Sequence, residues 1–289
     1  RWLDTTSGTL GLKQIAIDGK ALCGSADRAA GLGPLMLVSA WAVENRITLG
    51  QVAADDKSNE IAAIPELLKL LDLKGALVTI DAAGCQRKFA EQIVSGGGDY
   101  ALAVKGNQPK LLEDIQTATT EAVDNAAAGV GQALDCHETL DTSRGRVERR
   151  HYTVLDDLSG VRGREKWAGL TALGVCYSER TIAGETSCTI RYYILSRRLT
   201  AAEFGRACRQ HWGIENELHW QLDVTFGADA SRIQNRVGCE NFGMLRRLAL
   251  ALLKRQPYER GMKCKRLAAA VDTDFLEQIL LGTPKLGKV

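Results

Sequence analysis

The chain has 289 residues, of which 45% are hydrophobic and 25% are charged, and its formal net charge is +2. This length can bury a sizeable core in one large or two smaller domains, and the composition is that of an ordinary soluble protein. No apolar run approaches the ~18 residues of a membrane span, so we expect no membrane partner. The small net charge excludes a polycation, so nucleic acid could be recognised only through local clusters of charge.

Eight cysteines are scattered without a CxxC pair. This pattern favours reduced thiols and a cytoplasmic location. The chain begins at Arg1 without a signal sequence. We therefore expect it to lack the natural beginning of its protein.

The first 105 residues predict a mixed α/β layer, because apolar strand-like runs alternate with helical periodicity. Glu44 and Asn45 form a hairpin turn, and Ser58 and Asn59 cap the first helix. The expected elements are strands at 14–18, 35–43 and 46–54, a helix at 58–73, a strand at 75–81, a helix at 85–98 and a strand at 100–104.

In the rest of the chain the residue pattern is first helical, then β-like and then helical again. A polar, alanine-rich stretch at 108–128 predicts a helix, and residues 134–198 are β-like, which suggests a small inserted sheet. Thr200 and Glu203 form a capping box that starts another helix. A further helix ends before Pro257.

Two aspartates occupy the places where predicted core strands end. Asp18 ends the first strand and Asp81 the fourth. A strand fixes such an acid while its side chain emerges at the sheet edge, although a single one is more often a turn residue or a helix cap. With a third carboxylate, they would suit a pair of Mg²⁺ ions, because hard cations take oxygen ligands.

The stretch HWGIENELHWQLD at 211–223 could supply that third carboxylate. At 3.6 residues per turn, one face carries His211, Glu215, His219 and Asp223, while Glu217 points elsewhere. The two histidines could orient Glu215, contact phosphate or fill the helix face. They lack HExxH spacing, and residues spread over three turns do not readily converge on one zinc ion. Trp212 and Trp220 are expected in the core, although one of them could stack on an unpaired base.

Six motifs in register resemble the DDE transposases of the ISAs-type insertion sequences, the group that includes the H-repeat-associated proteins. The motifs are IAIDGK at 15–20, KSNEI at 57–61, VTIDAAGCQ at 78–86, GGDYALAVKGNQP at 97–109, GRVERR at 145–150 and HWGIENELHWQLDVTFGADASRI at 211–233. The resemblance implies an α/β fold, an RNase H-like mixed sheet with flanking helices, interrupted by a β-rich insertion before the last catalytic helix.

By this resemblance Asp18, Asp81 and Glu215 are the catalytic and metal-binding acids, with Asp223 in reserve. They would hold two Mg²⁺ or Mn²⁺ ions, cleave DNA strands and transfer the 3′-hydroxyl ends. The implied partners are double-stranded DNA, as element ends and target, and further copies of the chain. The glycine-bearing loops match no nucleotide fingerprint, so no nucleotide cofactor is expected.

The family pattern also predicts the domain organisation. Residues 1–106 form the first part of the catalytic core, 107–198 a helix and the β-rich insertion, 199–260 the helix of the catalytic Glu215 with the basic helix after it, and 261–289 a C-terminal tail. By the same resemblance, we expect the helical N-terminal domain of the family to be absent from this chain. Arg144 stands where the family usually has histidine before its Gly-Arg pair, so a DNA contact there could differ.

Two basic stretches, at 143–151 and 231–260, favour a polyanionic partner, although each alone could be solvated surface. The expected DNA-binding residues are Lys20, Lys105, Asn107, Arg144, Arg146, Arg150, His211, His219, Arg232 and Arg236. Two other interpretations remain: a catalytically silent or domesticated DNA-binding protein derived from a transposase, and a simple metal-dependent nuclease.

Overall fold

The computed structural model describes residues 13–54, 60–130, 133–143 and 145–282. The chain divides into two compact units. The first comprises Arg1–Leu12, Ala16–Leu71 and Trp212–Val289, and the second comprises Lys13–Ile15 and Asp72–His211.

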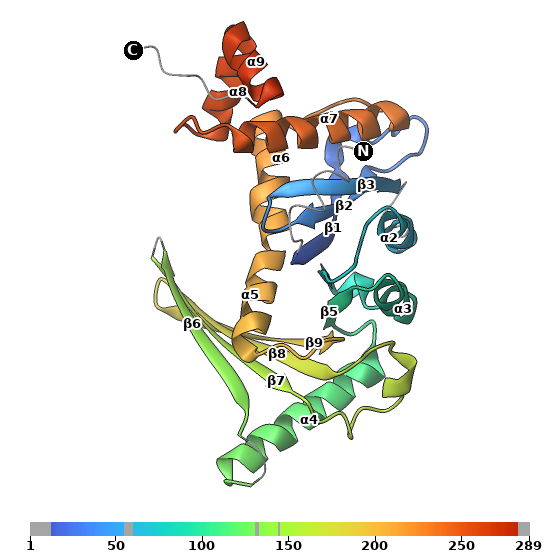
Figure 1. Ribbon diagram of the computed structural model, residues 1–289, viewed down its shortest axis with the longest axis vertical. Helices are drawn as coiled ribbons and strands as arrows, with labels where there is room; N and C mark the ends of the chain where they lie inside the picture. Colours follow the sequence, from blue (N-terminus) through green and yellow to red (C-terminus); the bar gives the residue numbers. More distant parts are fainter. Residues whose placement is uncertain (1–12, 55–59, 131–132, 144, 283–289) are drawn as a thin grey trace. The chain divides into compact units, whose positions relative to one another are not determined.

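The first unit contains three strands followed, later in the chain, by a series of helices. Its elements are β1 (Gln14–Leu22, shared with the second unit), η1 (Cys23–Ser25), β2 (Leu35–Ala42), β3 (Ile47–Ala54), α2 (Glu60–Lys69), η5 (Ile214–His219), α6 (Trp220–Phe226), α7 (Arg236–Arg255), α8 (Met262–Val271) and α9 (Thr273–Leu281). β2 and β3 pair antiparallel, and α7 runs along β3 (Figure 1). All eight residues of β2 are buried, as its apolar run predicts.

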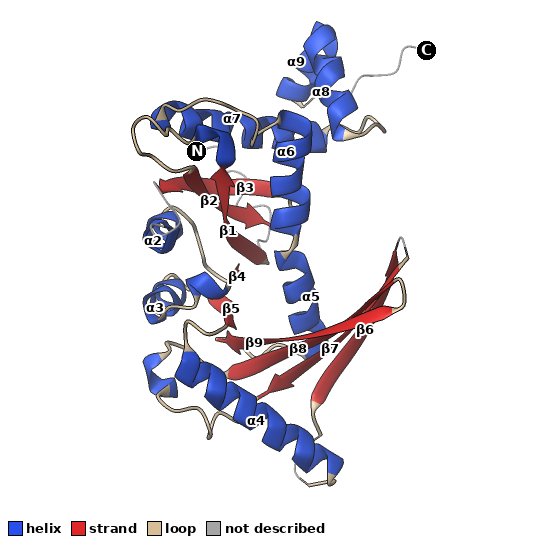
Figure 2. Cartoon of the chain, turned by 180° about the vertical axis from the view of Figure 1, so that it is seen from behind, coloured by secondary structure: helices blue, strands red, loops and turns tan. Residues whose placement is uncertain are grey.

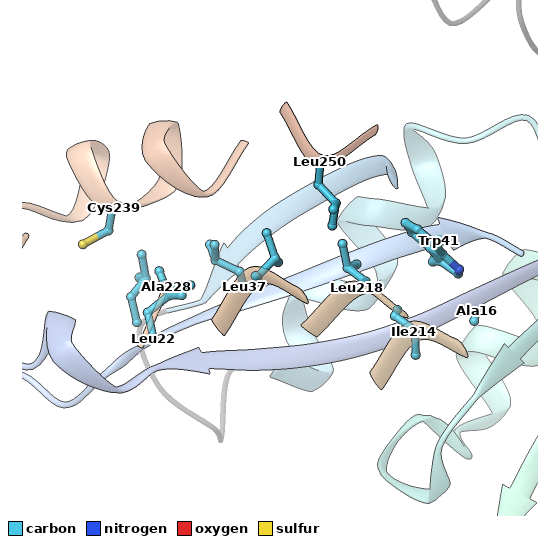
Figure 3. Packing of buried hydrophobic residues seen from close by; sticks show 11 residues of the cluster. Ala16, Leu22, Leu37, Trp41, Ile214, Leu218, Ala228, Cys239 and Leu250 are labelled. Atoms are coloured by element: carbon cyan, nitrogen blue, oxygen red, sulfur yellow. The ribbon is translucent and has the colours of Figure 1, made fainter. Parts of the chain in front are cut away.

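The core of this unit joins the strands to the helix that carries the expected third acid. Ile214, Leu218 and Leu222 are buried at four-residue spacing, against Leu37 and other residues of β1 and β2. Figure 3 shows Ile214 and Leu218 within this cluster. Burial of these apolar side chains, worth roughly 1.5–3 kcal/mol each, fixes which side of the helix faces the sheet.

The second unit continues from the start of β1 into a parallel and then an antiparallel set of strands. Its elements are β4 (Leu77–Ile80), η3 (Ala82–Gly84), α3 (Arg87–Ser95), β5 (Asp99–Val104), α4 (Pro109–Ala127), β6 (Asp135–Ser143), β7 (Arg146–Leu155), η4 (Arg164–Lys166), β8 (Ala172–Ile182), β9 (Glu185–Leu195) and α5 (Ala201–His211). β4 and β5 are parallel, and α5 packs against β6 and β7 (Figure 2).

The hydrogen-bonded strand order is β3-β2-β1-β4-β5-β9-β8-β7-β6. This large mixed sheet with flanking helices confirms the expected α/β class and is consistent with an RNase H-like fold. The β-rich insertion is not the separate small sheet that its sequence suggested. β9 pairs antiparallel with β5, so the insertion extends the sheet.

The start of α5, the residues before α2 and the C-terminal segment can be compared with the sequence predictions. The capping box is confirmed, because Glu203 accepts a hydrogen bond from the backbone of Thr200, whose hydroxyl accepts one from the Glu203 N–H. The predicted caps Ser58 and Asn59 lie outside the described residues. The segment expected as a C-terminal tail contains the two helices α8 and α9.

Candidate active site

The segment around Glu215 is a π-helix rather than part of one regular α-helix. η5 spans Ile214–His219, and the Trp220 N–H donates to the carbonyl of Glu215, five residues back. The regular stripe of four residues predicted from a 3.6-residue repeat is therefore interrupted. Single π-turns within helices are rare and occur frequently at functional sites.

Asp18 lies beside this π-helix, in the interior of a strand. β1 continues through Leu22, so the prediction that Asp18 ends its strand is wrong. The Nδ1 atom of His219 lies 3.4 Å from Oδ2 of Asp18, with side-chain exposures of 12% and 18%. His219 follows Glu215 by four residues, so the contact places Asp18 next to the element that carries Glu215.

The His219 side chain is neutral at pH 7. Burial, together with the positive charges of Arg247 and Lys20, lowers its pKa to about 3. The contact with Asp18 is therefore between a neutral imidazole and a carboxylate, not an ion pair between opposite charges. His219 can orient Asp18 through an Nδ1–H and leave its negative charge intact.

Glu215 and Glu217 have different surroundings although both lie in η5. Glu215 is exposed, and among the described residues its carboxylate has no ion pair. Glu217 contacts Arg46 at 3.2 Å and Lys254 at 3.7 Å. Positive partners already occupy Glu217, whereas Glu215 is available to a ligand.

Asp81 belongs to the second unit and directly follows β4, as predicted. Its Oδ1 atom accepts a hydrogen bond from the Ala83 N–H at 3.0 Å and caps η3. One carboxylate oxygen of Asp81 therefore has the capping role that is common for a single aspartate at a strand end. The side chain is exposed. The Asn107 amide donates to the Ala82 carbonyl at 2.7 Å, which ties the loop after β5 to the turn that carries Asp81. Lys105, in the same loop, is exposed.

His211 ends α5 and is held inside the second unit. Its Nδ1 atom lies 2.9 Å from the Thr79 hydroxyl in β4, which also accepts a hydrogen bond from Gln14. Burial lowers the pKa of His211 to about 4, although the charge of Asp81 acts in the opposite direction. His211 is therefore a neutral contact between α5 and β4, and a phosphate contact would require this hydrogen bond to open.

His211 should make the stability of the fold depend on pH. Its pKa is about 4 in the folded protein and 6.5 ordinarily, so between these values the unfolded chain binds a proton that the folded protein does not. Stability then falls as the pH decreases. We expect His211→Gln to reduce the loss between pH 7 and pH 4.5 by about 2–3 kcal/mol. Urea unfolding at both pH values measures this, and parallel pH profiles for parent and variant would contradict it.

Lys20 and Asp223 pair with each other inside the first unit. The Lys20 side chain is 8% exposed, and its ammonium lies 2.8 Å from Asp223 and 3.1 Å from Asp229. A DNA phosphate could reach Lys20 only if these pairs opened. Asp223, the reserve acid, already has a cationic partner. The contact of Asp229 was not predicted, because it depends on Lys20, 209 positions away in the sequence.

The arginines of β7 differ in exposure along the strand. Arg150 is 8% exposed and pairs with Glu148 and Asp141, whereas Arg146 is 46% exposed. Arg144 lies outside the described residues. The ion pairs also include Arg180 with Glu148 and Arg209 with Asp141, neither of which was predicted. Arg150 shares its face of β7 with the buried Tyr152 and Val154 at two-residue spacing, and this spacing was the signal for its buried position.

The basic stretch near α7 is also only partly exposed. Arg232 is exposed, while Arg236 donates to the Gly33 carbonyl at 2.8 Å. Arg247 is buried, and burial lowers its pKa to about 10. The expectation that Trp212 and Trp220 belong to the core is wrong, because they are 40% and 54% exposed. The residues between them form the π-helix, where the 3.6-residue periodicity used to place them does not apply.

The carboxylates are chemically suited to a divalent cation. Glu215 and Asp81 are exposed, and Asp18 contacts a neutral imidazole. Carboxylate oxygens are the ligands that Mg²⁺ prefers. Within the described part of the chain, no three His, Cys, Asp or Glu side chains are grouped so as to hold a metal ion.

The structure thus combines a mixed sheet with acids in β1, after β4 and in a late helical segment. Residues 13–252 match the family model described as "Transposase DDE domain". The chain belongs to this family.

Proteins similar to this chain are named as putative transposases. The chain is 42% identical over 278 residues to "Putative transposase YncI" of Escherichia coli O157:H7, covering 94% of this chain and 70% of that protein. It is 38% identical over 276 residues to "H repeat-associated putative transposase YhhI" of Escherichia coli (strain K12), covering 93% and 71%. These similarities confirm the predicted resemblance and support a transposase function with DNA as partner. No helix of the described residues has the length and apolar character needed to cross a membrane.

Proposed function

We propose that the chain is the catalytic region of a transposase that cleaves DNA strands at the ends of an insertion sequence and joins the 3′ ends to target DNA. Asp18, Asp81 and Glu215 are the proposed metal-binding acids. The observation that carries this proposal is the π-helix, which presents an exposed Glu215 without an ion pair to a described residue, one turn from the His219 that contacts Asp18.

The proposed chemistry consists of two phosphoryl transfers. In the first, the oxygen of water attacks phosphorus and the bond to the 3′ oxygen breaks, which leaves a 3′-hydroxyl at the element end. In the second, that hydroxyl attacks a phosphorus atom of the target DNA and the bond from this phosphorus to the target's 3′ oxygen breaks, which joins the element end to the target and leaves a 3′-hydroxyl on the target strand. Two bound Mg²⁺ or Mn²⁺ ions would activate the attacking oxygen and stabilise the leaving oxygen.

The chain's own residues have separate roles in this proposal. Asp18, Asp81 and Glu215 would supply the oxygen ligands. His219 orients Asp18 without neutralising it, because the imidazole is uncharged. Lys105, Asn107, Arg146 and Arg232 are the proposed DNA contacts that are exposed in the structure. We also propose that several copies of the chain assemble on the DNA.

Incubation of the protein with labelled element ends tests the proposed function. We expect strand cleavage in Mg²⁺ or Mn²⁺ and none in EDTA, because the three acids cannot act without the ions they bind. Denaturing gels of the products measure this. Binding of the ends without cleavage in either metal would instead identify the chain as a catalytically silent DNA-binding protein.

A further inference from the structure

A pocket lined mainly by polar residues lies in the first unit, and its lining includes neither Asp18 nor Glu215. Its volume is about 390 Å³. The lining comes from the turn between β2 and β3, the π-helix with the start of α6, the end of α7 and the start of α8. A pocket of this size accommodates a small polar group.

Positive charge exceeds negative charge in the lining. Arg46, Lys254 and Arg255 face a single carboxylate, Glu217, so two positive charges remain. Glu217 contacts Arg46 and Lys254, while the exposed Arg255 has no ion pair to a described residue. The pocket is therefore complementary to an anion.

Lys254 is held in a position that favours an additional negative charge. Its ammonium donates to the Glu217 carbonyl at 3.1 Å and lies 4.6 Å from the centre of the Trp41 ring. Burial lowers the pKa of Lys254, and Glu217 only partly opposes this effect. An anion bound beside the ammonium would offset its loss of hydration.

Carboxamide groups add hydrogen-bonding capacity around these cations. The Gln221 oxygen accepts from the Thr225 hydroxyl at 2.7 Å, so the Gln221 NH₂ group is directed to other acceptors. Asn45 and Asn216, which also line the pocket, each carry a carboxamide NH₂ group. Such N–H donors suit phosphate oxygens.

The backbone at the pocket rim is strained. Arg46 has a φ of 56°, in the left-handed region, where residues other than glycine are uncommon. Such strain costs on the order of 1 kcal/mol and often occurs at ligand sites. Here it accompanies the contact of the Arg46 guanidinium with Glu217.

We propose that this pocket binds a backbone phosphate of a DNA strand, as a contact site separate from the three acids. The inference rests on the proposed function, because DNA is the phosphate-bearing partner of a transposase. The cations supply attraction, and the carboxamide N–H groups supply direction.

Two substitutions test the pocket by different routes. Arg255→Gln removes the unpaired cation, and Asn216→Asp introduces a carboxylate of the same size. We expect each to weaken DNA binding about three-fold to ten-fold at low salt, and Arg255→Gln to reduce the slope of log affinity against log salt by about one unit. Arg28→Gln, an equal charge change at an exposed residue outside the lining, is the control.

The measurement is fluorescence anisotropy of labelled duplex and single-stranded oligonucleotides with the full chain in EDTA. Circular dichroism checks that each variant is folded. A change in both pocket variants but not in the control supports the proposal. Parent-like affinity in both folded variants overturns it. Loss of inorganic phosphate binding, measured by calorimetry, with unchanged binding of both oligonucleotides also overturns it, since the ligand would then be a small phosphate compound.

The pocket and the proposed function can fail separately. The anisotropy measurement excludes divalent metal and does not depend on cleavage. If the parent cuts element ends while the pocket variants bind DNA normally, only the pocket proposal fails. If the variants lose binding while the parent never cuts, the pocket proposal stands and the catalytic proposal fails.

Discussion

Glu215→Gln is expected to reduce cleavage of element ends by orders of magnitude while DNA binding persists. Glutamine has nearly the same size and keeps hydrogen-bonding atoms, but it lacks the negative charge that a divalent cation requires. Because Glu215 is exposed and has no ion pair to a described residue, the substitution removes no ion pair seen in the structure. Gel assays of labelled ends in Mg²⁺ measure cleavage, and anisotropy in EDTA measures binding.

Glu66→Gln is the matched control for this experiment. Glu66 lies in α2, is 60% exposed and pairs with Lys69 three residues on, so its loss should affect stability by less than about 1 kcal/mol. We expect this variant to cleave like the parent. If Glu215→Gln also cleaved like the parent, Glu215 would not be the third ligand. Asp223 would then become the candidate, and its pair with Lys20 would have to open during catalysis.

Much of the fold could be predicted from local patterns. Apolar runs at 35–43 and 100–104 gave strands β2 and β5, and the Thr200–Glu203 capping box gave the start of α5. The pairing of β9 with β5 could not be predicted in this way. Strand partners distant in sequence are chosen by tertiary packing, and nothing in the alternation of residues 185–195 specifies that partner.

The π-helix was not visible in the sequence for a related reason. Ile214, Leu218 and Leu222 have the four-residue spacing of an ordinary amphipathic helix, and no proline marks a break. A hydrogen bond from Trp220 to the carbonyl five residues back changes the backbone without changing that apolar spacing.

The residues of the candidate site could be proposed from the sequence, but their surroundings could be predicted only in part. Asp81 after β4 and Glu215 followed from strand ends, helix faces and family motifs. The contact of His219 with Asp18 depends on two segments about 200 positions apart, and the neutrality of the imidazole depends on the nearby Arg247 and Lys20. Charge and burial at this level arise only when the chain is folded.

Arg150→Met is expected to lower the free energy of unfolding by about 3–5 kcal/mol. Arg150 is 8% exposed, and its partner Glu148 is 5% exposed. Removing the arginine leaves a buried carboxylate without that cation. Arg180 and Arg146 lie 3.4 Å and 3.7 Å from Glu148, and they favour the lower end of this range. Urea unfolding measures the change.

The neighbouring Arg149 provides the control for Arg150. Because side chains alternate along β7, Arg149 lies on the opposite face, where it is 51% exposed and contacts the half-exposed Glu138 at 3.4 Å. Arg149→Met should cost less than about 1 kcal/mol. Replacing the buried pair together, as Arg150→Met with Glu148→Leu, should recover much of the lost stability, because no unpaired charge remains inside. If Arg150→Met instead left stability unchanged and flattened the salt dependence of DNA binding, Arg150 would be the phosphate contact that its sequence motif predicts.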